Sequence, residues 1–102
     1  MHSLLALAEF DAKRPVTKML HSSDPLRLVL FCLEAGQTVP AHSSPSTVAF
    51  YTLSGEGQVL VGDKKVAAEA GSLVMIQPNE PHGLSAGRGR LVVLAAIAPA
   101  PQ

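Results

Sequence analysis

The sequence predicts an all-β protein in which antiparallel strands close into a barrel. Most of the chain consists of short runs of β-forming residues, separated at close intervals by Gly, Pro, Asp and Ser. Helix signals are confined to the first residues. So many short strands leave exposed edges, and closing the sheet into a barrel removes them. The chain has 102 residues and is 47% hydrophobic, which suits one domain with one core.

The N-terminal segment, residues 1–15, is expected to be separate from the barrel, which takes residues 16–102. One or two helical turns are predicted over Ser3–Phe10, because Ser3 can cap the first turn and the apolar residues share one face. Pro15 ends this stretch. We expect the turns to pack over the end of the barrel.

Nine strands are predicted from the runs of β-formers that follow. They are Val16–His21, Leu26–Leu33, Thr38–His42, Thr47–Ser54, Gly57–Val61, Lys65–Ala68, Ser72–Gln77, His82–Ser85 and Arg90–Ala98. The segment Val61–Lys64 is expected to form a tight hairpin, because Gly62 can adopt the positive φ that such a turn requires.

Composition and charge exclude some classes of partner. Eight basic and eight acidic side chains cancel, so no long-range attraction to nucleic acid is expected. The longest apolar run, Leu91–Ala98, is far shorter than the roughly 20 residues that span a bilayer. No membrane association is predicted, and the N-terminus lacks a signal-peptide pattern, so a cytoplasmic location is expected. The single Cys32 stands among apolar residues and is expected to be a buried thiol.

The spacing of glycine and histidine from Gly36 to about Ala98 resembles the two sequence motifs of the cupin family. In the first, at residues 36–57, Gly36 is followed after five residues by His42, and the closing glycine falls at Gly55. The resemblance implies a double-stranded β-helix, the jelly-roll barrel of small RmlC-like cupins.

The second motif, at residues 71–86, opens at Gly71 and places His82 eleven residues later, as the cupin pattern requires. His42 and His82 are therefore the metal ligands that the resemblance implies. Other motif positions hold different residues: Ser44 replaces the second histidine, Val48 or Ala49 the glutamate, Gln77 and Asn79 a proline and a glycine, and Ala86 the terminal asparagine.

A metal site built from this pattern would be incomplete. A catalytic metal normally takes three protein ligands, and the two histidines supply only two. A divalent transition metal (Zn, Fe, Mn or Ni) would need a third ligand, for which Glu80 and Gln77 are candidates beside His82. The alternative is that each histidine only hydrogen-bonds to a buried main-chain group or water.

Strand alternation predicts which side chains share the pocket. If His42 points inward, Thr38, Pro40 and Ser44 share its side, while Val39 and Ala41 point away. On the next strand, Val48, Phe50 and Thr52 are expected to point inward and Tyr51 outward. Val48 and Phe50 would then make an apolar wall. The predicted pocket residues are Ser44, Val48, Phe50, Gln77 and Glu80.

Three functions remain open from the sequence. The first is a small metal-dependent enzyme, such as an oxygenase or isomerase, and the second is a metal-free module that binds a small molecule without catalysis. Acid–base chemistry by the two imidazoles, as in epimerase-like cupins, would also need a proton donor, and the only tyrosine, Tyr51, is predicted to face outward. The third is a homodimer or partner contact, for which the apolar strand Leu26–Leu33 is the candidate surface.

Overall fold

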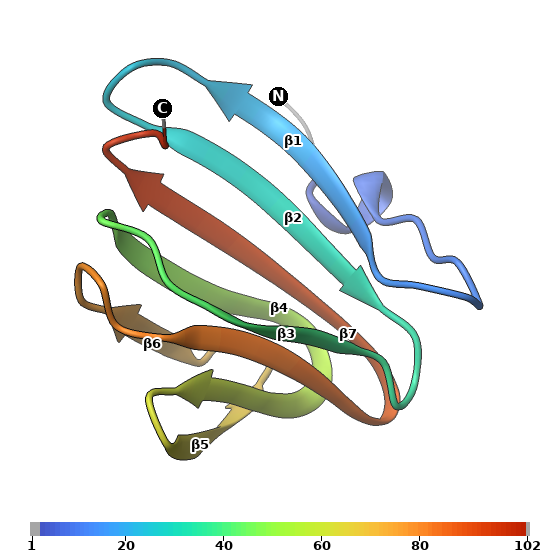
Figure 1. Ribbon diagram of the computed structural model, residues 1–102. Coiled ribbons are helices and arrows are strands. Elements are labelled where there is room, and N and C mark those ends of the chain that lie inside the picture. The colour runs from blue at the N-terminus through green and yellow to red at the C-terminus, as the bar shows by residue number, and fades with distance from the viewer. Residues whose placement is uncertain (1–2, 102) are drawn as a thin grey trace.

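The computed structural model describes residues 3–101 and has the predicted all-β fold (Figure 1). One short 3₁₀-helix, η1 at Leu5–Leu7, precedes seven strands. The strands are β1 (Val16–Ser22), β2 (Arg27–Leu33), β3 (Thr38–His42), β4 (Thr47–Val61), β5 (Lys64–Glu69), β6 (Leu73–Ile76) and β7 (His82–Ala98). Over residues 3–101 the structure contains no helix of the length and apolar character that a membrane span requires.

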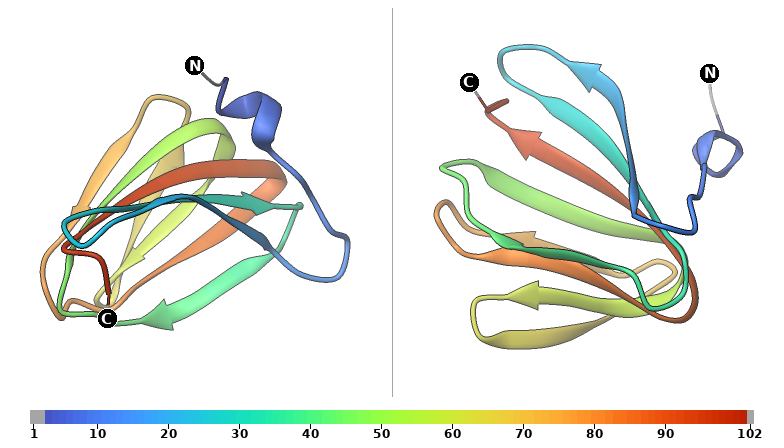
Figure 2. Two further views of the ribbon diagram at one scale, coloured as in Figure 1. Left: turned by 90° about the horizontal axis from the view of Figure 1, so that it is seen from above. Right: turned by 45° about the vertical axis from the view of Figure 1, so that its right-hand side comes forward.

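The strands form one antiparallel sheet that folds over into two layers (Figure 2). The first layer consists of β1, β2, the second half of β7, the first half of β4, and β6. The second layer consists of β3, the first half of β7, the second half of β4, and β5. The barrel has a bend end, where β4 and β7 cross between the layers, and a loop end opposite, where β3 ends and β7 begins.

Two pairs of predicted strands are single long strands in the structure. Thr47–Ser54 and Gly57–Val61 are both parts of β4, and His82–Ser85 and Arg90–Ala98 are both parts of β7. The glycines between them indicated turns. Strand pairing instead continues through them, with Gly55 at a φ of +87°. The register shifts where the strands bend from one layer to the other, at Thr52/Ser54 and at Gly55/Gly57.

The predicted hairpin at Gly62 is confirmed. β4 ends at Val61 and β5 begins at Lys64, so the connection is Gly62–Asp63, and Gly62 has a φ of +61°. A two-residue hairpin loop with a positive φ at its first position favours glycine there, because glycine adopts that conformation without steric cost.

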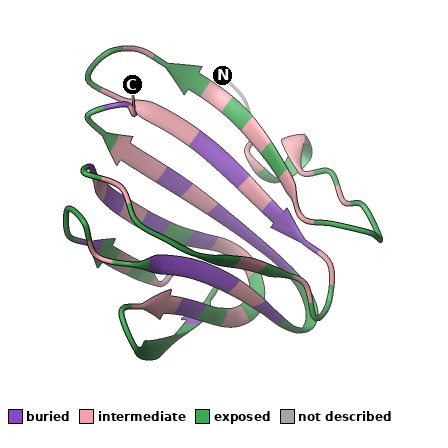
Figure 3. Cartoon of the chain, viewed as in Figure 1, coloured by how far each residue is buried: buried purple, intermediate pink, exposed green. Residues whose placement is uncertain are grey.

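The core lies between the two layers, where alternate side chains of each strand are buried (Figure 3). β2 shows the alternation: Val29 and Leu33 belong to this core, whereas Leu30 and Cys32 point to the outside of the first layer. All four are buried, at 5% exposure or less. The outward pair is buried because the N-terminal segment covers it, which explains why β2 is apolar on both faces.

The N-terminal segment packs against the outer face of the first layer, and not over the barrel end as expected. Leu7, Ala8 and Phe10 contact the cluster that contains Leu30 and Cys32. The one or two predicted helical turns are a single short helix, η1, in the structure. Its N-cap residue is Leu4, not Ser3, and no side chain caps it with a hydrogen bond. The short helix is held by packing rather than by its own capping.

Candidate functional site

His42 and His82 lie side by side at the loop end of the barrel. They are register partners, at the end of β3 and the start of β7, and their ring centres are 4.4 Å apart with an interplanar angle of 56°. His82 is 3% exposed, whereas His42 is exposed. One imidazole is therefore part of the barrel interior, and the other lies over it on the solvent side.

Both imidazoles are oriented by main-chain carbonyls two residues earlier in the chain. The Nδ1 atom of His82 lies 2.9 Å from the Glu80 oxygen, and that of His42 lies 3.3 Å from the Pro40 oxygen. A carbonyl oxygen can only accept, so each Nδ1 must donate. In the neutral form each ring then keeps its lone pair on Nε2, which is free to accept a hydrogen bond or to bind a metal.

A row of aromatic rings leads from the histidines into the barrel. The ring of Phe50 is 5.8 Å from that of His82, and Phe31 meets Phe50 edge to face at 6.3 Å. Phe50 is 3% exposed and Phe31 is half-buried. The histidine pair thus has an apolar aromatic wall behind it.

A bulge in β3 turns His42 inward. Between Val39 and His42, three steps along β3 are opposite two along β7. His42 therefore lies on the same side of β3 as Val39, which packs against the core. The prediction that Val39 points away from the histidine side is wrong, because this extra residue reverses the alternation. Simple strand parity missed it.

Gly83 lets β3 approach closely enough to bring the histidines together. A Cβ atom on Gly83 would lie 2.5 Å from the main-chain oxygen of Val39 and 3.1 Å from the nitrogen of Ala41. Any larger residue would push β3 away from β7 beside His42. Gly83 is thus a positioning residue that the sequence reasoning missed, and its place directly after His82 was the available signal.

The two predicted wall residues are where alternation put them. Val48 and Phe50 are buried in the core at 2% and 3% exposure, and Thr52, also predicted to point inward, is 1% exposed. Tyr51 is 41% exposed on the opposite face of β4. The only tyrosine therefore lies away from the histidine pair.

The other predicted pocket residues lie in the loops at the same end as the histidines. Ser44 is half-buried, and its main-chain oxygen accepts a 2.7 Å hydrogen bond from the nitrogen of Asn79. Gln77 is exposed, and its main-chain nitrogen donates to the Glu80 carboxylate at 3.1 Å. A ligand contact by Ser44, Gln77 or Glu80 stays a prediction.

The donor set does not fit a metal held by three protein ligands. Within residues 3–101 no three His, Cys, Asp or Glu side chains come together in a way that could hold a metal ion. The Glu80 carboxylate, one candidate third ligand, accepts from the main chain of its own turn. His42 and His82 alone offer two ligand positions.

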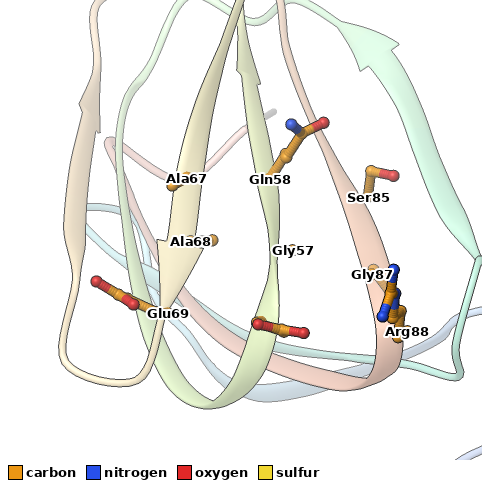
Figure 4. A pocket seen from close by; sticks show the side chains of 10 residues that line it. Gly57, Gln58, Ala67, Ala68, Glu69, Ser85, Gly87 and Arg88 are labelled. Carbon is orange, nitrogen blue, oxygen red and sulfur yellow. The ribbon is translucent and has the colours of Figure 1, made fainter.

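A separate hollow lies on the outer face of the second layer (Figure 4). It has a volume of about 320 Å³, and its floor is formed by small residues of β4, β5 and β7 such as Ala67 and Gly87. Gln58 lies on the central strand β4, and Glu69 and Arg88 lie at the two sides. Neither histidine lines it, so this hollow and the histidine pair are distinct features.

Comparison with known proteins assigns the family. Residues 29–97 match the cupin domain, which is more than half of the chain, and the chain therefore belongs to the cupin family. No curated protein matches.

Solved structures agree over nearly the full chain. An RmlC-like cupin from Desulfovibrio desulfuricans is 33% identical, with a TM-score of 0.89, covering 97% of this chain and 95% of its own. A protein from Thermus thermophilus is 24% identical, with a TM-score of 0.93 and coverage of 99% and 98%. An uncharacterised double-stranded β-helix protein from Klebsiella pneumoniae is 19% identical, with a TM-score of 0.89 and coverage of 97% and 89%. None of the three is named after an activity, so the likeness shows a small RmlC-like cupin barrel.

Proposed function

We propose that this cupin binds a small, largely apolar molecule at the loop end of the barrel, without a metal. The observation that carries the proposal is the orientation of the histidine pair, in which both Nδ1 atoms are paired with main-chain carbonyls. Two Nε2 atoms then remain as hydrogen-bond acceptors. A hydroxyl or N–H group on the ligand would complement them.

The surroundings of the pair favour an apolar ligand body. Phe50 and Phe31 form a wall beside His82, and further core-packed residues at this end, including Val61 and Ile97, are only half-buried. A ligand that covers these side chains removes apolar surface from water, and this burial favours binding. A few polar groups within an apolar lining are typical of small-molecule sites.

Phenol and anisole are matched probes for this proposal, because they share the aromatic ring and only phenol has a hydroxyl donor. Metal-depleted protein is titrated with each, and the imidazole signals of His42 and His82 are followed by NMR. We expect phenol to shift both signals and to bind about 2- to 10-fold more tightly than anisole, the value of one neutral hydrogen bond.

Substitution of His42 tests the site without disturbing the core, because this side chain is exposed. His42→Ala should reduce the preference for phenol over anisole, because only the Nε2 of His82 then remains as an acceptor. The matched control is His21→Ala, an exposed histidine of β1 that pairs with Ser23 at 3.0 Å. Equal binding of the two probes, or loss of the preference in His21→Ala, would contradict the proposal.

A second candidate function is a weakly held divalent transition metal (Zn, Fe, Mn or Ni) at the same pair. Two imidazoles that bind one metal through Nε2 at about 2.0–2.1 Å have ring centres roughly 4.5 Å apart when the ligands subtend a right angle and roughly 5.2 Å apart in a tetrahedral site. The observed 4.4 Å is close to the right-angle spacing. Water or a ligand would have to complete the coordination shell.

Elemental analysis of protein purified without a tag separates the two candidates. A metal site predicts uptake of one of these ions, lost in His42→Ala and retained in His21→Ala. Less than about 0.1 metal per chain after incubation with each ion excludes the metal candidate and leaves the metal-free one.

A further inference from the structure

A small polar notch lies where the β1–β2 hairpin meets the segment that follows β7 (Figure 1). Its volume is about 300 Å³, at the lower end of the range for small-molecule sites. It is lined by Ser22, Ser23, Asp24, Arg27, Ala100 and Pro101. Neither histidine of the candidate site is among these residues, so the notch is a separate feature of the barrel.

Hydrogen bonds hold both walls of the notch in place. The turn between β1 and β2 is closed by two main-chain hydrogen bonds of 2.9 and 3.3 Å. The nitrogen of Ala100 donates to the main-chain oxygen of Asp24 at 3.1 Å. The Ser46 hydroxyl, directly before β4, donates to the Pro99 oxygen at 2.6 Å. A site whose walls are already fixed loses little conformational freedom when it binds a ligand.

Arg27 brings a positive charge without a partner to this notch. Its side chain is half-buried, and its Nε–H group is fully buried and has no acceptor within residues 3–101. The neighbouring Nη2 donates to the Pro101 oxygen at 3.4 Å, which is longer than an ordinary hydrogen bond. The guanidinium forms no ion pair with any carboxylate that the structure describes. A buried donor without an acceptor costs free energy, so a ligand that accepts from Nε and Nη2 would be stabilised there.

Lys18, the other half-buried lysine or arginine among the described residues, shows the usual arrangement. Its ammonium donates to the Glu9 carboxylate at 2.8 Å and to the Leu7 oxygen at 2.9 Å. Lysine and arginine side chains are seldom buried unless they are paired in this way. Arg27 lacks the carboxylate partner that Lys18 has, and an anionic ligand would take that place.

We propose that the notch binds a small carboxylate whose two oxygens accept from Nε and Nη2 of Arg27. These two N–H groups lie side by side on one edge of the guanidinium, which is the geometry that a carboxylate matches with two hydrogen bonds. The carboxylate would replace the long bond to Pro101. Asp24 is exposed, lines the same notch and forms no ion pair with Arg27. Its negative charge disfavours a dianion and favours a hydrogen-bond donor on the ligand. The ligand class is therefore a small carboxylate with a hydroxyl or an ammonium group beside it.

The NMR signal of the Arg27 Nε–H group measures binding directly, because this group is the one that lacks an acceptor. Acetate, glycolate and glycine are titrated at constant ionic strength, with sodium chloride as the reference. The three probes share a carboxylate, and only glycolate and glycine carry a donor beside it. We expect all three to shift the Arg27 signal. Glycolate or glycine should bind about 2- to 10-fold more tightly than acetate, the value of one hydrogen bond. The tighter of the two identifies the donor as a hydroxyl or an ammonium group.

Substitutions separate the two charges, and the amide signals of Ser23 and Ala100 measure binding in the variants. Arg27→Gln should weaken acetate binding by about tenfold or more. Arg27→Lys keeps the charge but loses the paired N–H groups, and it should also weaken binding. Asp24→Asn should retain acetate binding and remove the advantage of the donor-bearing probe. Arg14→Gln, at an exposed arginine of the N-terminal segment, is the matched control and should bind acetate as the wild type does.

Three results would overturn the carboxylate site: an unshifted Arg27 signal, a shift that sodium chloride reproduces, or unchanged acetate binding in both Arg27 variants. Equal affinity of the three probes, or an advantage that survives in Asp24→Asn, would contradict the role of Asp24. Circular dichroism checks that the variants remain folded. The imidazole signals of His42 and His82 should stay in place when acetate binds, so the outcome is independent of phenol binding at the histidines.

Discussion

The bend end and the loop end of the barrel differ in how the interior is filled. At the bend end, Leu33 and Leu91 face each other across β2 and β7 and are both 0% exposed. At the loop end the facing residues are two histidines, one of them exposed. Close aliphatic packing provides most of the stability of such a domain. The comparison places the closely packed aliphatic core and the proposed ligand site at opposite ends of the same strands.

Removing a large side chain at the bend end should have the largest effect on stability. We expect Leu91→Ala to lower the free energy of unfolding by about 2–5 kcal/mol, because it leaves a cavity in a fully buried site. Urea denaturation measures the change, and Val66→Ala on the surface is the control. Phenol affinity of the folded protein should stay within about twofold. A large loss of affinity would show that the two ends are not separate.

A methyl group at Gly83 tests the boundary between the two ends. Gly83→Ala would bring a Cβ against the main chain of Val39, and we expect a cost of about 1–3 kcal/mol with displacement of β3. The displacement should separate the imidazoles and abolish the phenol-dependent shift of both histidine signals. Gly89→Ala is the matched control, because nothing lies within 4 Å of that position. An intact histidine response in Gly83→Ala would contradict the positioning role.

The Phe10 side chain packs against the outer face of the first layer at the bend end, and its removal tests how much this cover stabilises the protein. The Arg90 guanidinium lies 4.1 Å from the centre of the Phe10 ring, and Phe10 packs against the cluster that contains Cys32. We expect Phe10→Ala to cost about 1–2 kcal/mol through lost apolar burial and the lost cation–π contact.

The reactivity of the Cys32 thiol provides a second measure of how Phe10→Ala exposes this cluster. Burial raises the pKa of the Cys32 thiol, so the folded state favours the neutral form. The resulting stability is complete below the ordinary thiol pKa and is lost as pH rises through the raised value. Phe10→Ala should make the loss of stability at alkaline pH smaller. It should also speed modification of the Cys32 thiol by a thiol-reactive disulfide reagent. Unchanged reactivity would mean that Phe10 is not the cover.

The smallest effect is expected at the exposed ion pair of the bend end. Arg90 donates to the Glu34 carboxylate at 2.8 Å, and this hydrogen bond lowers the pKa of Glu34. Its stabilising contribution is present above the ordinary carboxyl pKa and fades as pH falls through the lowered value. In Arg90→Gln the Glu34 pKa, measured by NMR, should rise toward its ordinary value. No rise would show that the pair is not formed in solution.

Sequence reasoning predicted the fold because spacing and alternation are local properties. The glycine and histidine intervals identified the cupin motifs, and parity placed Val48 and Phe50 inside and Tyr51 outside, as the structure confirms. Alternation failed at Val39, because a bulge depends on the partner strand as well as on the chain itself.

The other wrong predictions also depended on tertiary contacts that the local sequence does not show. Glycines inside β4 and β7 indicated turns, but these strands continue as single strands where they pass between the layers. The N-terminal segment was expected at the barrel end, and it lies instead on the apolar face that β2 offers to it. The sequence shows that a segment is apolar, whereas the tertiary fold decides which surface it covers.

The pairing of β7 has a consequence for how the protein is made. β2, β3 and β4 all take β7 as a partner, so neither layer is complete without residues 82–98. Pairings between such distant segments slow folding, because the loop must close before the contact is gained. On the ribosome, the earlier strands would have to wait with unpaired edges until β7 emerges. The nascent chain is therefore expected to need protection from aggregation until the last strand is synthesised.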